Sequence, residues 1–115
     1  MVKTVVLVED CDKTLEMTKF ILSKLGVKNV LTARDENEFA ALLNTSIIPD
    51  LIITDWNITN TLKGSDVISA MSKFDKPIAV VSSEQKQETT HEKQAWFRKP
   101  LSITELTKWL KNFYS

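Results

Sequence analysis

The sequence has few of the residues that usually divide or cross-link a chain. Its 115 residues include one cysteine, two glycines and three prolines, and no stretch is repetitive. A single cysteine excludes an internal disulfide framework and a cluster of thiolate metal ligands, which favours a reducing compartment. Because linkers are commonly rich in glycine and proline, their scarcity predicts one globular domain over residues 1–115.

Two further absences limit the possible partners. The formal net charge is zero, with 15 basic and 15 acidic residues, so the composition does not favour nucleic acid or an anionic membrane. The apolar runs are far shorter than the roughly 20 residues of a membrane-spanning helix. The amino-terminal residues lack the layout of a signal peptide. We therefore expect a cytoplasmic protein that binds neither nucleic acid nor membrane.

What the sequence does have is an alternation of short apolar runs and segments with apolar residues at helical spacing. The runs predict buried strands, and the segments between them predict helices. Strands alternating with helices are typical of an α/β fold, a doubly wound parallel sheet with helices on both faces. The five predicted strands cover residues 5–8, 27–31, 51–55, 77–81 and 95–98.

Capping residues predict where two of the helices begin and end. Asp12 is expected to be the N-cap of the first helix, with Phe20 on its apolar face and Gly26 at its C-terminal end. Ser102, followed three residues later by Glu105, predicts the start of the last helix.

One interval breaks the alternation. Residues 83–94 contain no apolar residue. A helix without an apolar stripe cannot dock firmly on a sheet, so this segment is predicted to be a solvated short helix or a loop. The only histidine, His91, lies in it and is interpreted as solvated.

Polar side chains stand where four of the apolar runs end: Glu9 and Asp10, Asp55, Ser82, and Lys99. The carboxyl ends of parallel strands border the crevice where ligands bind, so these side chains should meet in one pocket. Three carboxylates so placed repel one another unless a cation lies between them. Oxygen ligands favour a hard divalent ion, Mg²⁺ or else Mn²⁺, over zinc.

A hydroxyl and an ammonium beside such a metal ion would let the pocket hold a phosphoryl group. Lys99 and the metal would neutralise the phosphoryl oxygens, and Ser82 would donate a hydrogen bond. A carboxylate is then the natural acceptor, which gives an aspartyl phosphate at Asp55. Such a transfer needs positioning and charge neutralisation more than a separate base.

The order Glu9-Asp10, Asp55, Ser82 and Lys99-Pro100 resembles the receiver domain of two-component response regulators, the CheY-like family, along nearly the whole chain. The resemblance implies a flavodoxin-like fold with strand order 2-1-3-4-5. It implies that Asp55 receives a phosphoryl group from a phosphohistidine of a sensor histidine kinase or a histidine phosphotransfer protein. Such a domain is not an enzyme beyond its own phosphorylation and dephosphorylation, and it switches a surface for a downstream protein that the sequence does not name.

The same resemblance implies roles for single residues in metal binding. Glu9, Asp10 and Asp55 would help to hold Mg²⁺, together with the backbone carbonyl of Asn57. Lys99 would pair with the phosphoryl group, and the peptide bond that follows it is typically cis in this family.

The resemblance also implies roles for four residues in switching and in the lifetime of the phosphorylated form. By the resemblance, Ser82 is the switch hydroxyl and Trp96 is the aromatic side chain that moves with it. Asn57 and Glu84 stand two positions past the acceptor and the switch hydroxyl, where side chains tune hydrolysis of the acyl phosphate.

The sequence departs from the receiver pattern in two regions. The proline usual four residues after the acceptor is Thr59, and the loop leading to Gly64 is one residue longer than usual. The stretch between Ser82 and Lys99 is several residues short, which predicts a shortened or poorly formed fourth helix. In the family this region is part of the output surface.

Two other interpretations stay open. A degenerate receiver could act as a binding module independently of phosphate, which Thr59 and the short polar segment favour. The motif Asp10-x-Asp12-x-Thr14 resembles the first motif of haloacid dehalogenase-type phosphatases, in which Asp10 would be the nucleophile and Asp12 the general acid. Substitution of Asp55 or of Asp10 by asparagine separates these interpretations.

Overall fold

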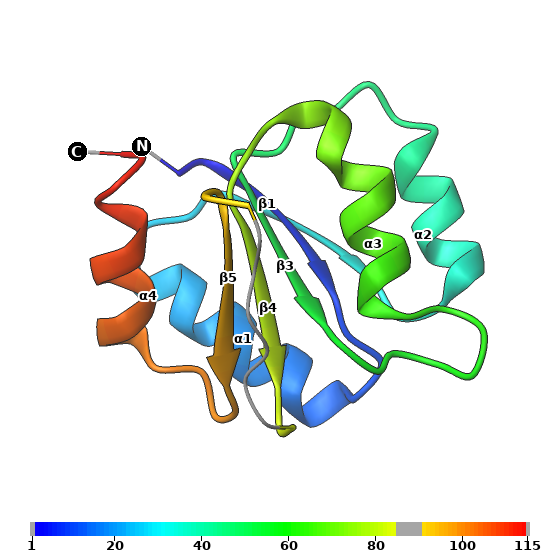
Figure 1. Ribbon diagram of the computed structural model, residues 1–115, viewed down its shortest axis with the longest axis horizontal. Coiled ribbons are helices and arrows are strands. Elements are labelled where there is room, and N and C mark those ends of the chain that lie inside the picture. The colour runs from blue at the N-terminus through cyan, green and yellow to red at the C-terminus, as the bar shows by residue number, and fades with distance from the viewer. Residues whose placement is uncertain (1, 85–90, 115) are drawn as a thin grey trace.

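The computed structural model describes residues 2–84 and 91–114. The strands are β1 (Thr4–Val8), β2 (Asn29–Ala33), β3 (Leu51–Asp55), β4 (Ile78–Ser82) and β5 (Gln94–Arg98). The helices are α1 (Asp12–Lys24), α2 (Glu36–Leu43), α3 (Gly64–Met71) and α4 (Ile103–Leu110), with a short 3-10 helix at Ser72–Phe74. Figure 1 shows the sheet between two helical layers, with α2 and α3 on one face and α1 and α4 on the other.

The five strands form one parallel sheet in the order β2-β1-β3-β4-β5. Parallel neighbours need crossover connections, and α1, α2 and α3 supply the first three of them (Figure 1). The doubly wound α/β fold and the strand order 2-1-3-4-5 are therefore confirmed.

The core has two parts, because alternate residues of each strand face opposite helical layers. The strand residues that face α1 and α4 are Val5, Leu7, Leu51, Ile53, Ala79, Val81 and Phe97. Those that face α2 and α3 are Val6, Val8, Ala33, Ile52 and Ile78. Strands buried on both faces need apolar side chains at every position, which explains the uninterrupted apolar runs of the sequence.

Strands β1 and β3 reach the same edge of the sheet in register. Val8 pairs with Thr54, so Glu9 and Asp55, the next residues along, emerge beside each other. The N–H of Glu9 donates to the carbonyl of Ala33 at 3.0 Å, which holds Glu9 in line with the end of β1. The backbone itself thus brings two of the predicted site residues together.

The start of α1 differs from the prediction for Asp12. Cys11 occupies the N-cap position and makes no side-chain capping bond, and Asp12 is the first helical residue. Its carboxylate pairs with Arg34, with Nη1 and Oδ1 2.9 Å apart. The prediction was wrong because the helix begins one residue earlier than expected, so that Asp12 lies in the first turn, where an acidic side chain is favoured by the helix dipole rather than needed as a cap.

Phe20 is not on the buried face of α1. It is 61% exposed, and the Nζ of Lys24 lies 5.1 Å from its ring centroid. Three consecutive apolar residues, 20–22, cover more than half the circumference of a helix, so they cannot all face the sheet. Leu22 is the fully buried member of the three.

The end of α1 follows the prediction, whereas β2 begins two residues later than predicted. Gly26 has φ 81°, the left-handed conformation that ends many helices. The N–H of Val27 donates to the carbonyl of Leu22 at 3.1 Å. Since that bond belongs to the helix terminus, Val27 is not available for the strand.

The polar segment between β4 and β5 contains no helix among its described residues, Ser83, Glu84 and 91–93, consistent with a shortened or poorly formed fourth helix. Residues 85–90 of the segment lie outside the described residues. His91 is exposed, and its Nδ1 accepts the N–H of Lys93 at 3.1 Å. Within the described ranges, no helix is long and apolar enough to cross a membrane.

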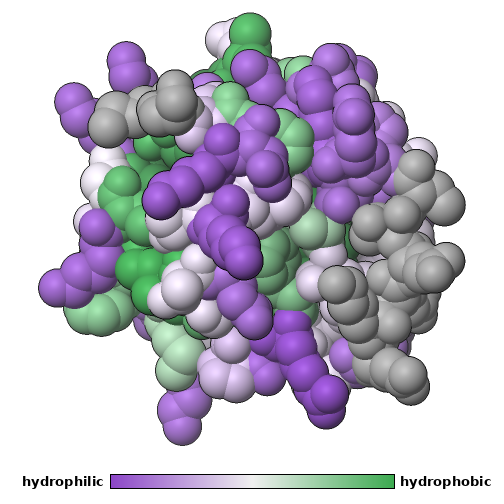
Figure 2. Space-filling view, turned by 60° about the vertical axis from the view of Figure 1, so that its left-hand side comes forward, coloured by the Kyte–Doolittle hydropathy of each residue, from purple (hydrophilic) through white to green (hydrophobic). Residues whose placement is uncertain are grey.

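Apolar surface is exposed between α1 and α4, at the left of Figure 2. A pocket of about 220 Å³ lies between these helices, lined by Leu22, Leu25, Leu51 and Leu110 among others. It is at the edge where the strands begin, and no described carboxylate lines it. The charged residues singled out in the sequence gather at the opposite edge.

Candidate functional site

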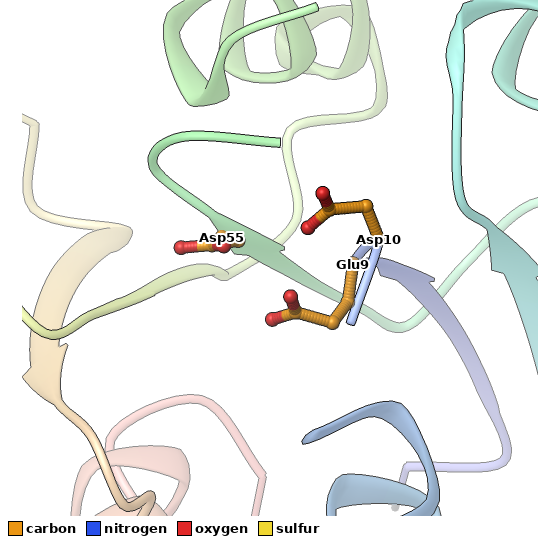
Figure 3. Close-up of side chains that lie close together, drawn as sticks. All are labelled: Glu9, Asp10 and Asp55. Atoms are coloured by element: carbon orange, nitrogen blue, oxygen red, sulfur yellow. The ribbon is translucent and has the colours of Figure 1, made fainter. Parts of the chain in front are cut away.

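Three carboxylates meet where β1 and β3 end. One carboxylate oxygen from each of Glu9, Asp10 and Asp55 lies within 4.8 Å of the other two. In Figure 3 the side chains of Glu9 and Asp10 extend from the end of β1 to the side on which Asp55 lies, at the end of β3. Glu9 and Asp55 are only 3% and 9% exposed, whereas Asp10 is exposed. These three residues, called the acidic cluster below, were predicted to converge, and they do.

Lys99 lies against the acidic cluster. Its Nζ is 3.1 Å from Oε2 of Glu9 and 3.3 Å from Oδ2 of Asp55. The backbone N–H of Lys99 donates to the carbonyl of Ser82 at 2.9 Å. The Lys99–Pro100 peptide bond is cis, as the resemblance implied. The backbone of the β5–α4 connection therefore directs this ammonium group to the end of β3.

The cluster carries more negative charge than Lys99 neutralises. Burial, together with the nearby charge of Asp55, raises the pKa of Glu9 from its usual 4.5 to about 7. Burial alone would lower the pKa of Lys99, but the charges of Glu9 and Asp55 outweigh it and raise that pKa. Because the raised pKa comes from burial and from a second carboxylate, a further positive charge beside these oxygens would favour the ionised form of Glu9. Carboxylate oxygens within reach of one another are the donors that a hard divalent ion prefers.

Ser82, Asn57 and Glu84 are linked to one another beside the cluster. The hydroxyl oxygen of Ser82 accepts the N–H of Glu84 at 3.0 Å. The carboxylate of Glu84 in turn accepts Nδ2 of Asn57 at 2.5 Å. Ser82 is 2% exposed and makes no side-chain hydrogen bond to Asp55 among the described residues. The sequence placed these residues at the site, but the contact between Asn57 and Glu84 was not predicted.

Two tryptophans pack together next to Asp55. The ring centroids of Trp56 and Trp96 are 5.1 Å apart, and the rings are tilted by 54°. Trp96 is 6% exposed, and its Nε1 has no hydrogen-bond partner among the described residues. A tryptophan pair adjoining Asp55 makes intrinsic fluorescence a direct report on the site.

The loop that follows Asp55 leaves the end of β3 and comes back beside it at the start of α3. Asn57 and Lys63 pair as an isolated antiparallel bridge, and the N–H of Gly64 donates to the carbonyl of Trp56 at 2.7 Å. A Cβ on Gly64 would lie 2.8 Å from the carbonyl oxygen of Asp55. Glycine is therefore required here by close backbone approach, and this packing fixes the first residues after β3.

A contact outside the predicted site also reaches this loop. The carboxylate of Glu36, at the start of α2, accepts hydrogen bonds from the hydroxyls of Thr59 and Thr61. No sequence signal could have found it, because a threonine hydroxyl in a loop has no preferred distant partner.

A family model described as the response regulator receiver domain matches residues 5–111. The chain belongs to this family. Receiver domains are signalling domains that accept a phosphoryl group, and they are not enzymes in the usual sense. Their partners are signalling proteins such as kinases and phosphotransfer proteins.

Solved structures of receiver domains share the fold. A response regulator receiver domain protein from Bacillus halodurans is 18% identical, with 97% of each chain covered and a TM-score of 0.76. The chemotaxis response regulator CheY4 of Vibrio cholerae is 24% identical, covering 97% of this chain and 98% of its own, with a TM-score of 0.74. The receiver domain of the hybrid histidine kinase CckA is 22% identical, covering 95% and 96%, with a TM-score of 0.72. The comparison with curated proteins found no match.

Proposed function

We propose that this receiver domain, residues 1–115, accepts a phosphoryl group on Asp55 from a phosphohistidine of a sensor histidine kinase or histidine phosphotransfer protein. The observation that carries the proposal is the position of Lys99, whose Nζ lies 3.3 Å from Asp55 and 3.1 Å from Glu9. These three residues come from three different strand ends. An ammonium held beside a carboxylate in a partly buried pocket supplies the positive charge that incoming phosphoryl oxygens need.

In the transfer, a carboxylate oxygen of Asp55 attacks phosphorus as the P–N bond of the phosphohistidine breaks. The imidazole nitrogen keeps the electron pair of that bond and takes a proton from solvent. Lys99 neutralises charge on the phosphoryl oxygens, and the hydroxyl of Ser82 donates to one of them. The second carboxylate oxygen of Asp55 is held by the N–H of Trp56 at 2.7 Å, which orients the nucleophile.

Mg²⁺, or Mn²⁺ in its place, would be held by Glu9, Asp10 and Asp55 with the backbone carbonyl of Asn57. When bound, the ion supplies further neutralisation of the phosphoryl oxygens. The raised pKa of Glu9 and the convergence of three carboxylates support this donor set.

The output would be a rearrangement around Ser82. Its hydroxyl oxygen accepts the N–H of Glu84, and a turn of the hydroxyl towards a phosphoryl group on Asp55 would break that bond. Glu84 would then lose this contact, and the indole N–H of Trp96, which has no hydrogen-bond partner among the described residues, would favour a second position of that side chain. Such a two-state element could present a changed surface to a downstream protein.

The two alternatives fit the geometry less well. A phosphate-independent binding module would have no need for Lys99 to contact both Glu9 and Asp55. In the phosphatase interpretation Asp12 would be a general acid beside Asp10, but its carboxylate is engaged with Arg34.

Incubation with Mg²⁺ and acetyl phosphate tests the proposal directly. We expect intact-protein mass spectrometry to show the gain of one phosphoryl group, labile to hydroxylamine, with the adduct located at Asp55. The gain should disappear when the metal is removed with a chelator. A stable adduct, or one on another residue, would contradict the assignment. No adduct with this donor or with a phosphohistidine protein would favour the phosphate-independent module.

The raised pKa of Glu9 predicts a pH dependence of metal binding. A carboxyl group must lose its proton to bind metal, so the half-saturating Mg²⁺ concentration should rise about tenfold for each pH unit below 7 and level off above 7. In the metal-free protein, folded Glu9 binds protons that the unfolded chain releases near pH 4.5. Its contribution to the free energy of unfolding is therefore present below pH 4.5 and is lost as the pH rises through 7. Mg²⁺ titrations followed by tryptophan fluorescence over about two pH units around neutrality measure the first effect, and a flat profile would contradict it.

A further inference from the structure

The loop of residues 57–63, between β3 and α3, is closed at its tip by a threonine side chain. The N–H of Thr59 donates to the carbonyl of Leu62 at 3.0 Å. The hydroxyl oxygen of Thr59 accepts the N–H of Thr61 at 3.2 Å and that of Leu62 at 2.9 Å. The tip is therefore a compact turn whose shape depends on one hydroxyl group.

Both hydroxyl protons at this tip go to one carboxylate oxygen. Oε2 of Glu36, the first residue of α2, accepts from Thr59 at 3.2 Å and also from Thr61. The bond from Thr61, more than that from Thr59, lowers the pKa of Glu36, so the carboxylate stays ionised and accepts both. On the inner side of the loop, Ile58 and Leu62 are 3% and 5% exposed in the core under α2 and α3. The loop is thus held from below by apolar packing and at its tip by Glu36.

We propose that Glu36 is a positioning residue for metal binding, because it fixes the loop from which the carbonyl of Asn57 would reach the acidic cluster. This role rests on the proposed function. A backbone carbonyl has no rotamers of its own, so its place relative to Glu9, Asp10 and Asp55 is set by the loop that carries it. Groups that hold a metal ligand in place affect affinity without touching the metal.

Substitution of Glu36 by alanine should weaken Mg²⁺ binding about tenfold, the lower end of the range for lost supporting contacts. The dissociation constant is measured by titrating tryptophan fluorescence with Mg²⁺ alone. The rate of phosphorylation by acetyl phosphate should stay within about twofold of the wild-type rate at saturating Mg²⁺. In the metal-free variant, the amides of loop 57–63 should exchange with solvent deuterium faster than in the wild type.

Two matched variants separate the effect of the hydrogen bonds that Glu36 accepts from the loop from the effect of its charge. Glu36→Gln removes the charge but keeps an oxygen that can accept both hydroxyls, so it should bind Mg²⁺ nearly as the wild type does. Glu16→Ala removes one acidic charge on α1, where Glu16 pairs with Lys19, and should also leave affinity unchanged. The double variant Glu36→Ala/Thr61→Val should lose no more affinity than Glu36→Ala alone, because both changes break the same contact.

The outcomes distinguish this inference from the proposed function. If the wild type responds to Mg²⁺ and Glu36→Ala binds it equally well, Glu36 has no positioning role and the proposed function stands. If Glu36→Gln loses as much Mg²⁺ affinity as Glu36→Ala, the effect comes from the charge, and the positioning role of the hydrogen bonds to Glu36 is overturned. If the wild type itself gives no response to Mg²⁺ and no phosphoryl adduct, both ideas fail together.

Discussion

Replacement of Asp55 by asparagine is expected to reduce phosphoryl incorporation at least about 1,000-fold, to below detection in most assays. The amide oxygen is far too weak a nucleophile to displace a leaving group from phosphorus. It can still accept the N–H of Trp56, which in the wild type donates to Oδ1 at 2.7 Å, so the fold should be unaffected. The measurement is intact-protein mass spectrometry after incubation with acetyl phosphate and Mg²⁺, with circular dichroism to establish folding.

Asp12→Asn is the matched control for this substitution. It changes the net charge equally near the same edge of the sheet, but the side chain of Asp12 pairs with Arg34 and is outside the acidic cluster. We expect its labelling to stay within about twofold of the wild type. Labelling kept in Asp55→Asn and lost in Asp10→Asn would instead favour a phosphatase in which Asp10 is the nucleophile.

The position of the acidic cluster was predictable because it follows from the sheet. The apolar run 51–55 ends on Asp55 with no intervening residue, and the run before Glu9 ends as abruptly. Parallel strands place their carboxyl ends at one edge, so two acidic residues after adjacent strands must lie close together. The observed register, with Val8 opposite Thr54, leaves little freedom for any other outcome.

Helix boundaries were less predictable, because local signals compete there. Gly26 was correctly placed at the end of α1, but the terminus also uses the N–H of Val27, which delays β2 by two residues. Phe20 was wrongly placed in the core, since hydrophobicity does not say which of several adjacent apolar residues faces the sheet. The tertiary structure decides these cases.

Side-chain contacts between loops lay beyond what the sequence could predict. The hydrogen bond from Asn57 to Glu84 joins two loops that are 27 residues apart, and neither loop has a periodic pattern. Thr59 was noted only as a departure from the proline usual in receiver domains. The structure shows that its hydroxyl organises the turn and joins it to Glu36, so a polar network restrains a loop that proline would restrain through its ring.

Replacement of Lys99 by alanine should lower both the rate of phosphorylation and the stability of the metal-free protein. Phosphorylation by acetyl phosphate at saturating Mg²⁺ should slow about 100-fold, because one preorganised positive charge on the phosphoryl oxygens is lost. The metal-free protein should lose about 2 kcal/mol of unfolding free energy, less than a fully buried pair would cost, because the pocket admits some solvent. The side chain of Lys99 is 22% exposed, whereas those of Glu9 and Asp55 are 4% and 11% exposed.

Mg²⁺ should restore the stability of Lys99→Ala but not its rate. A divalent ion among the three carboxylates relieves the repulsion that Lys99 relieves in the wild type, but it cannot also take the place of the ammonium beside the phosphoryl group. Lys93→Ala is the control: that side chain is 28% exposed and pairs with Asp75, near the opposite end of β5. Urea unfolding with and without Mg²⁺ measures stability, and mass spectrometry over time measures the rate. Equal effects of Lys99→Ala and Lys93→Ala on the rate would show that Lys99 acts only through the fold, and the proposed part of its ammonium in phosphoryl transfer would have to be withdrawn.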